Sequence, residues 1–571
     1  MKKRVFAAVI FLFSIFDFFA NDQKIWHVDS EVYKFMNYLY VSQGHAMPNS
    51  AGPWSTDELK RMLYNLPYEY EDKNVQVLYD KIDSILNEPA GFSTSDGLDF
   101  TVHGIINPEV YVHTNKEDFT EEDDWFYDFE KRQKLLNAEA QLWISNNFYG
   151  YLDVDFGYSS YAFDGIPSPL YQNTVVCNVP MITGQSFSYV SSNFPTRSFI
   201  SAGGEHWNFS AGRDILRWGN GETGNLFLGG TQIYDNNMRF SFFYNSFKFS
   251  FASIFYPHPG TVENSDNQDS TVDGVALFLA HRTDFRFFKD KINLGLSEAI
   301  MFQSASNTLD FRVFNPMVIY HSLYIRGNAN SMFSADLNYS VIPGLNFYGQ
   351  ILVDDLDVGE TNHKSDENTK WRPNKMGYML GSKYILPLEI GVLKLSLEVV
   401  YTDPCLYLRE KYNAKTQQYG VSFYGTLREF QNAGSSVGGN SVSYLRNCVG
   451  YVYGGDSIVG DLKISLDSLE NCRMGFEFFY MVHGIMYNDL DEDWITGKGS
   501  SSPSTYDQTG TSNKSGVPEH FFRISAAGDY DILKWLNVDC GIDNWLILNK
   551  NNQPNPIVYD LQLHAGVKIK K

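Results

Sequence analysis

The chain has 571 residues, of which 16% are aromatic and 20% charged, and its formal net charge is -22. This negative balance argues against a nucleic-acid partner and against charge-driven binding to an anionic membrane surface. The mean hydropathy of -0.29 excludes a protein made mainly of transmembrane helices. Length alone would suggest several domains, but a large β-barrel absorbs most of a chain as one unit.

Residues 1–20 have the three parts of an export signal. Lys2, Lys3 and Arg4 form a basic start, an almost unbroken apolar run follows, and Ala20 offers a small residue at a cleavage point. The run is shorter than the roughly 20 residues that a spanning helix needs, and an aspartate interrupts it. We therefore predict a signal peptide that is removed on export, in preference to a retained anchor, with the cleavage site left open.

Residues 21–95 are predicted to form a three-helix domain, because apolar residues recur there at helical spacing in three stretches. Ser55 and Glu58 fit a capping box that opens the second helix. So small a bundle buries little core alone, so we expect it to dock on the rest of the protein, on the periplasmic side. The aligned apolar positions are Val32, Phe35, Met36 and Leu39, then Leu59, Met62, Leu63 and Leu66, then Val75, Leu78, Ile82 and Ile85.

Residues 96–571 repeat an alternation of apolar and polar positions with a period of two. It is clearest from Ile557 to Ile569, where every second residue is apolar. One face of such a strand suits lipid and the other suits water. The pattern predicts a mainly β fold, a transmembrane antiparallel β-barrel of roughly 16–18 strands. The other clear stretches are 152–158, 333–341 and 393–401.

The connections between predicted strands alternate in length. Short turns such as those near Asn245, Gly344 and Gly454 separate long polar segments. Outer-membrane barrels show this asymmetry, with short periplasmic turns and long external loops. The alternative is a large secreted β-sandwich or solenoid, although no repeat of fixed period is visible. The long segments are 114–133, 159–196, 257–271, 355–375, 403–440 and 484–518.

One segment carries a motif beyond the alternation. Residues 212–228 read GRDILRWGNGETGNLFL, which is Gly-Arg at a strand end, then Trp-Gly-x-Gly, then Gly-x-Leu-x-Leu. This order resembles the signature of the Wzi-type capsule assembly family, outer-membrane barrels with an N-terminal helical domain. Asn220 stands where that family usually has proline, and the chain ends in Lys570-Lys571 instead of an aromatic residue. The resemblance covers essentially the whole mature chain.

The resemblance implies a protein of the bacterial outer membrane that binds or anchors an exported polysaccharide at the cell surface. It implies no covalent chemistry and no cofactor, and its partners would be outer-membrane lipid, the barrel assembly machinery and an exported polysaccharide. Two alternatives stay open. An outer-membrane porin or solute uptake channel would keep its lumen open. A surface adhesin would bind protein through its long loops.

The candidate polysaccharide-binding residues are arginines and aromatics, because guanidinium pairs bidentately with carboxylates and aromatic rings stack on sugar faces. Counting strands places the motif at the external side, where it can fold into the lumen. In the structural alternative, the arginines pair with lumen carboxylates such as Asp153 or Asp155, and the tryptophan packs. The candidates are Arg213, Arg217, Trp218, Trp125 and Tyr127, and the structural glycines are Gly212, Gly219, Gly221 and Gly224.

Catalytic and metal-binding patterns are weak. The sequence has no Gly-x-Ser-x-Gly elbow, no His-Glu-x-x-His and no phosphate-binding glycine loop, so we predict no enzyme. Acidic runs at 117–130 and 489–493 could hold calcium and bridge an anionic polysaccharide, but solvated loops are favoured. Of the five cysteines, Cys448 and Cys472 are a candidate disulfide pair, although inert strand residues are favoured.

Overall fold

The protein is described by a computed structural model. It describes residues 23–48, 51–94, 97–115, 135–145, 147–156, 175–179, 197–230, 235–256, 275–304, 311–315, 318–323, 329–356, 374–404, 406–408, 421–432, 440–484 and 517–571. The predicted export signal, Trp125, Tyr127 and both acidic runs lie outside the described residues.

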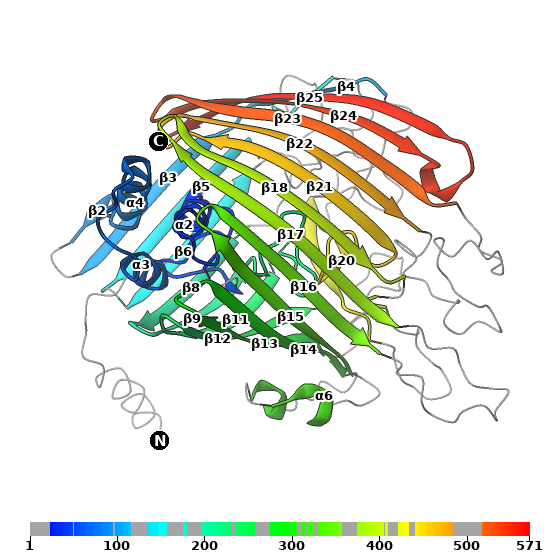
Figure 1. Ribbon diagram of the computed structural model, residues 1–571, viewed down its shortest axis with the longest axis horizontal. Helices are drawn as coiled ribbons and strands as arrows, with labels where there is room; N and C mark the ends of the chain where they lie inside the picture. The colour runs from blue at the N-terminus through cyan, green and yellow to red at the C-terminus, as the bar shows by residue number, and fades with distance from the viewer. Residues whose placement is uncertain are drawn as a thin grey trace.

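In the described part of the chain, 18 antiparallel strand positions form a closed barrel, as the alternation predicted (Figure 1). The strands are β3 (Leu98–Ile106), β4 (Glu109–His113), β5 (Leu136–Ile144), β6 (Phe148–Phe156), β7 (Val175–Cys177), β8 (Arg197–Gly204), β9 (Trp207–Asp214), β11 (Asp235–Phe243), β12 (Phe247–Tyr256), β13 (Val275–Phe287), β14 (Ile292–Ser304), β15 (Ala329–Ile342), β16 (Leu345–Asp355), β17 (Lys375–Leu388), β18 (Gly391–Thr402), β21 (Ser457–Asp467), β22 (Cys472–His483), β23 (Glu519–Leu533), β24 (Leu536–Leu548) and β25 (Ile557–Lys570). Strands β3 and β4 together occupy one of these positions, and β5 and β7 together occupy the next, because β3 pairs with β5 and β4 with β7.

The remaining elements are helices and short strands. They are α2 (Glu31–Ser42), α3 (Thr56–Tyr64), α4 (Lys73–Leu86), α6 (Tyr320–Leu323), the 3-10 turns η4 (Phe311–Phe314) and η5 (Lys550–Asn552), the two-residue strands β1 (Ala51–Gly52), β2 (Phe92–Ser93) and β10 (Arg217–Trp218), and a separate hairpin of β19 (Tyr424–Asn432) and β20 (Asn440–Cys448). Among the described residues, no helix is long and apolar enough to cross a membrane.

The barrel closes where the ends of its chain meet. Strand β25 pairs with β3 through Lys570 and Ile105, and with β4 through Leu563 and Val112. Figure 1 shows β25, in red, beside β4, in blue, at the top of the view. Among the described residues, closure gives each of the 18 strand positions a partner on both sides, which is the condition for strands to span a membrane.

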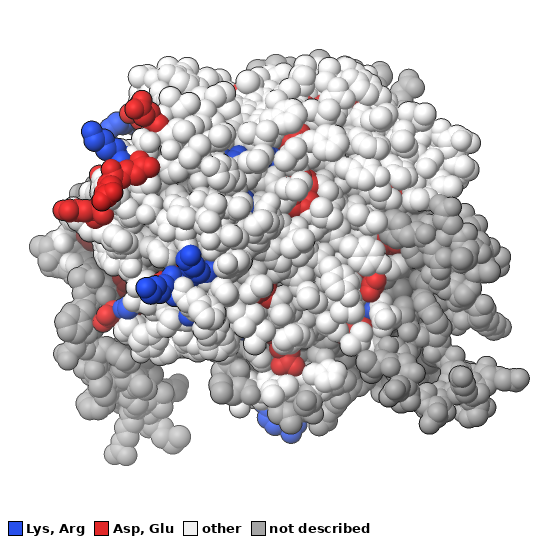
Figure 2. All heavy atoms as spheres, viewed as in Figure 1, with Lys and Arg blue, Asp and Glu red and all other residues white. Residues whose placement is uncertain are grey.

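The two faces of the strands differ as predicted. On β18, Leu395, Leu397 and Val399 are exposed on the outside, while Ser396 and Glu398 are buried inside. The same alternation holds on β6, β15 and β25. Figure 2 shows a side wall with few charged side chains, which gather instead at the end that carries the N-terminal helices. The wall is therefore suited to lipid, and the chain has the architecture of an outer-membrane β-barrel.

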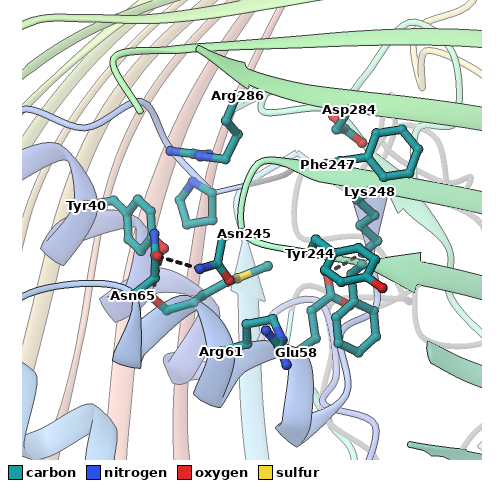
Figure 3. Close-up of a pocket in the computed structure, with 13 residues that line it drawn as sticks. Tyr40, Glu58, Arg61, Asn65, Tyr244, Asn245, Phe247, Lys248, Asp284 and Arg286 are labelled. Carbon is teal, nitrogen blue, oxygen red and sulfur yellow. Dashed lines mark hydrogen bonds and ion pairs between the residues drawn. The ribbon is translucent and has the colours of Figure 1, made fainter. Parts of the chain in front are cut away.

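The predicted helices α2, α3 and α4 form, and they dock at the end of the barrel that carries the short turns. Here Arg61 on α3 contacts Glu205 in the β8–β9 turn at 3.0 Å, and Asn245 in the β11–β12 turn donates to Asn65 at 2.7 Å. Figure 3 shows Asn65 and Asn245 facing each other across this contact. We call this the short-turn end, and the opposite end the long-loop end.

The segment that leads into α3 enters the lumen and does not rest on the rim. Lys248 on β12 reaches Glu58 at 2.5 Å and the carbonyl of Ala51 at 2.7 Å, and both charged side chains are about 2% exposed (Figure 3). Arg239 on β11 donates to the carbonyl of Pro53. The helices and the lumen share one apolar core, so the N-terminal domain is part of the barrel's interior.

Two local expectations from the sequence differ from the structure. The hydroxyl of Ser55 accepts from the backbone N–H of Glu58 at 3.3 Å, which is one half of the predicted capping box. The carboxylate of Glu58 turns to Lys248 and does not close the other half, because a buried ammonium group needs an anion. The candidate disulfide is not formed, since Cys448 and Cys472 are both free and lie on β20 and β22.

Candidate functional site

The motif segment leaves β9 and folds back into the lumen, where residues 215–230 form an insert that we call the luminal plug. Its glycines allow this course. Gly212 and Gly219 have φ values of 147° and 135°, which other residues rarely adopt. A Cβ atom at Gly212 would collide with Ser198 and Phe199 of β8, and one at Gly219 with Asn225. The glycines of the motif are therefore structural at these two positions.

A carboxylate on the barrel wall holds the centre of the plug. Glu398 on β18 accepts hydrogen bonds from the backbone N–H groups of Glu222 and Thr223 at 2.8 and 2.9 Å. It also accepts from the hydroxyl of Thr223 at 2.5 Å and from that of Tyr348 on β16 at 2.7 Å. Four donors thus converge on a side chain that is 1% exposed. Such charge-assisted bonds are about twice as strong as neutral ones.

Neutral side chains hold the next turn of the plug. The amide of Gln350 on β16 accepts from the backbone N–H of Leu226 at 2.9 Å and donates to the side-chain oxygen of Asn225 at 2.7 Å. The hydroxyl of Tyr407 donates to the carbonyl of Leu226 at 2.5 Å. The wall therefore supplies the partners that the irregular backbone of the plug cannot supply for itself.

An ionic cluster adds to this anchoring. Glu222 of the plug lies 2.7 Å from Lys383 on β17 and 2.8 Å from Lys394 on β18. Burial alone would raise the pKa of Glu222, but the ammonium groups of Lys383, Lys394 and Lys463 hold that pKa well below its usual value. The carboxylate is therefore charged at neutral pH, and its charge is matched from the wall.

The plug and the N-terminal segment are joined to each other. Ala51 pairs with Trp218, and Gly52 with Arg217, in a small antiparallel sheet. Arg217 also contacts Asp29 at 2.7 Å. Burial alone would raise the pKa of Asp29, but the Arg217 guanidinium lowers it below its usual value. Two inserts that are distant in sequence therefore form one body within the lumen.

The predicted binding residues Trp218 and Arg217 differ in their exposure and in their partners. Trp218 is 1% exposed, and its ring stacks on Phe227 with centroids 5.9 Å apart, which corresponds to the packing role that the sequence left as an alternative. Arg217 pairs with Asp29 and not with the suggested Asp153 or Asp155. Its role as a glycan contact stays a prediction.

Arg213 is separated from Arg217 and Trp218. It pairs in register with Ser198 on β8 and Asn236 on β11, whose neighbours Phe199 and Asn237 face the lumen and are buried. Arg213 therefore occupies an outward register position, near the long-loop end of β9. The structure brings Arg217 and Trp218 together with Gly219, Gly221 and Gly224, and leaves Arg213 at an outward register position of β9.

Sequence reasoning did not find the residues that anchor the plug. Glu398, Gln350 and Lys383 are inward positions of ordinary alternating strands, and nothing in their local sequence distinguishes them from other polar lumen residues. Their signal is the closeness of the plug, which only the closed barrel provides. The charge match between Glu222 and the lysines is visible only after the strands are placed in order.

Among the described residues, no group of three or more His, Cys, Asp or Glu side chains could hold a metal ion. The charged groups of the plug are paired with groups outside it: Glu222 with Lys383 and Lys394 on the wall, and Arg217 with Asp29 of the N-terminal segment. What the arrangement does is fill the lumen over part of its cross-section and fix the insert to β16, β17 and β18.

Comparisons with known proteins bear on the fold. No protein-family model matches the chain, and no curated protein matches its sequence. Its fold is similar to that of Wzi from Escherichia coli, described as an outer membrane protein involved in group 1 capsule assembly and a carbohydrate-binding β-barrel. The identity is 12%, the match covers 95% of this chain and 99% of that one, and the TM-score is 0.55.

Two other solved structures are also similar, at lower scores. The outer membrane channel DcaP of Acinetobacter baumannii matches with 9% identity over 85% of this chain and 100% of that one, with a TM-score of 0.36. OprD of Pseudomonas aeruginosa matches with 7% identity over 85% and 99%, with a TM-score of 0.37. The resemblance to the Wzi-type architecture that the motif predicted is confirmed at the level of the fold.

Proposed function

We propose that this protein is a non-enzymatic outer-membrane barrel that binds an exported polysaccharide at the cell surface and retains it there. The observation that carries the proposal is the luminal plug, which Glu398, Gln350 and three lysines fix inside the barrel. A solute channel needs a continuous aqueous path, whereas a binding protein needs a rigid frame for its external loops. The likeness in fold to a carbohydrate-binding barrel supports the same conclusion.

In this proposal the short-turn end faces the periplasm and the long-loop end faces the outside. The polymer is held by the external loops, with Trp125 and Tyr127 as stacking residues and Arg213 as a cationic contact near the rim. Arg217 and Trp218 serve the plug, since both contact the N-terminal segment. An arginine pairs with acidic sugars, and aromatic rings cover their apolar faces.

The direct test is retention of the cell's own surface polysaccharide by cells that carry either the wild-type protein or Trp125→Ala/Tyr127→Ala. We expect the double variant to lose most of the retained polymer while keeping the heat-modifiable gel migration of a folded barrel. Trp535→Ala, at an exposed tryptophan in the short β23–β24 turn, is the matched control and should retain it. Equal retention by all three proteins would refute the proposed contacts.

Conductance in planar bilayers separates this function from its main rival. A plugged barrel should be nearly silent, whereas a porin gives stepwise currents. Regular, voltage-stable steps from the wild-type protein, together with no polysaccharide pulled down by the purified barrel, would instead favour the uptake channel.

A further inference from the structure

A cavity at the short-turn end lies outside the plug and outside the proposed surface site. It has a volume of about 290 Å³ and is bounded by the N-terminal segment, the C-terminal end of α4 and the inner faces of β3 and β5. Figure 1 shows α4 beside β3 and β5 at this end of the barrel. The volume is close to the lower end of the roughly 300–1,000 Å³ range of small-molecule sites. We call it the mouth cavity.

Two tryptophans line the mouth cavity. Trp143 pairs in register with Asp99 on β3 and Tyr149 on β6, on the inward face of the wall. Trp26 comes from the N-terminal segment, and its indole N–H donates to the hydroxyl of Thr56 at 2.9 Å. Both rings are only partly buried. They lie inside the wall, so they are not part of the aromatic belt that faces lipid headgroups.

Polar groups surround these rings. The oxygen of Gln141 accepts from Tyr149 at 3.2 Å, which fixes the orientation of that amide. The hydroxyl of Thr101 accepts from the backbone N–H of Gly91 at 2.8 Å, and its O–H remains a donor. His103 faces the lumen and is exposed. Two aromatic faces with amide, hydroxyl and imidazole groups at their edges make a surface for a ring that has an apolar face and hydroxyls around its edge.

The charges narrow the class of ligand. The charged residues that line the cavity are Lys24, Glu88 and Asp99, so one ammonium group is outnumbered by two carboxylates. The ammonium of Lys24 lies 4.1 Å from the centre of a Trp26 ring. A dense polyanion would be repelled by the two carboxylates, whereas a neutral or amino sugar meets donors and acceptors of both kinds.

We propose that the mouth cavity binds one or two neutral or amino sugar units of a glycan that reaches the short-turn end. Trp143 and Trp26 stack on the sugar, while Gln141, Thr101 and His103 bind its hydroxyls. The same chemistry is offered by two sources, the cell-wall glycan and the exported polysaccharide. This site is independent of the external contacts in the proposed function, because it lies at the opposite end of the barrel.

The test measures binding to the full-length protein in detergent micelles by calorimetry. The probes are peptide-free cell-wall glycan strands of six sugars and size-matched fragments of the cell's own surface polysaccharide. We expect saturable binding of one or both probes, weakened at least tenfold by Trp143→Ala. The variant His103→Ala, at an exposed position that bears no packing, should weaken it severalfold. Trp535→Ala, at the same end but outside the cavity, should bind as the wild type does.

The outcomes are distinct. Binding of only one probe supports the site and identifies its source, and binding of both supports it as a general glycan site. Absence of saturable binding by the wild type, or equal binding by Trp143→Ala in a barrel with normal heat-modifiable migration, overturns the proposal. Surface retention by Trp143→Ala cells is measured in parallel. If the external site alone holds the polymer, retention stays at the wild-type level while calorimetric binding falls.

Discussion

The lumen has two sectors that differ in what fills them. In the packed sector, formed by β9, β11 to β18 and β21, inward side chains such as Arg239, Lys248 and Arg282 are no more than 2% exposed. In the wet sector, formed by β3, β5 and the short-turn halves of β22 to β25, inward positions such as His103, Gly475 and Ala527 are exposed. Both sectors belong to one continuous barrel with one alternation.

The difference shows what a polar lumen face can do. In the packed sector it acts as a set of hydrogen-bonding partners for an inserted backbone, because Glu398 and Gln350 satisfy N–H groups of the plug. In the wet sector the same kind of face is solvated and lines the mouth cavity. The packed sector provides rigidity and the wet sector provides access. A substitution that adds volume should therefore destabilise the protein in the packed sector and have little effect on its stability in the wet sector.

The largest effect is expected at Glu398. Glu398→Ala removes the acceptor of four hydrogen bonds and leaves buried donors without a partner. We expect the docking of the plug to weaken by about 3 kcal/mol or more in total, because each buried donor left without a partner costs about 1–3 kcal/mol. Stepwise conductance should appear in planar bilayers. Glu398→Gln keeps one acceptor oxygen and should be intermediate; a silent Glu398→Ala barrel would argue against this anchor.

The ionic cluster makes docking of the plug sensitive to acid. The pKa of Glu222 is depressed in the folded protein, so the unfolded state binds more protons below its ordinary value of 4.5. The stabilisation is therefore complete above about pH 4.5 and is lost as the pH falls through the lower folded pKa. Guanidinium unfolding in micelles between pH 3 and 6 should show this slope, and Glu222→Gln should flatten it. If Glu222→Gln has the same dependence of unfolding free energy on pH as the wild type, the acid sensitivity belongs to other groups.

A matched pair of glycines compares the two sectors directly. Gly381 on β17 faces the packed sector, and an added Cβ would collide with the ring of Tyr348. Gly475 on β22 faces the wet sector, with nothing within 4 Å of an added Cβ. Gly381→Ala should destabilise by about 1–3 kcal/mol through overpacking, and Gly475→Ala should stay within about 0.5 kcal/mol. Equal unfolding midpoints would contradict the division into sectors.

The smallest effect is expected at the junction of the two inserts. The side chains of Arg217 and Asp29 are about 32% and 58% exposed, so solvent screens the attraction between their charges. Arg217→Ala should cost no more than about 1 kcal/mol, while Arg217→Lys should recover part of it. Surface polysaccharide retention should not change. A strong loss of retention with normal unfolding would restore Arg217 to the polysaccharide-binding residues.

Much of this barrel is predictable because its physics is local. The period of two in β18 and β25 requires one face for lipid and one for water, and the spacing of Val75, Leu78 and Ile82 requires a helix. The position of those helices is not local. Glu58 satisfies the sequence rule for a capping box, yet Lys248, 190 residues away, takes its carboxylate. A buried charge pair outweighs a helix cap, and that partner appears only in three dimensions.

The candidate site divides in the same way. The glycines around Trp218 could be predicted to permit a tight insert, because backbone angles are a property of residue type. Trp218 itself is chemically suited both to stacking on sugars and to packing. In the structure its side chain is 1% exposed, its ring stacks on Phe227, and its backbone pairs with that of Ala51. No feature of the sequence predicts these neighbours.

The closure of the barrel sets an order of assembly. The N-terminal residues leave the ribosome first, but the seat of α2 is built from strands as late as β21 and β22. Asp467 on β21 accepts from Lys34 and Tyr38 at 2.9 and 2.5 Å, and Arg473 on β22 pairs with Glu31. The wall around that seat is complete only when β25 joins β3 and β4. The earliest-made helices must therefore wait for the last strand, so a chain truncated before β25 should leave them open to proteolysis.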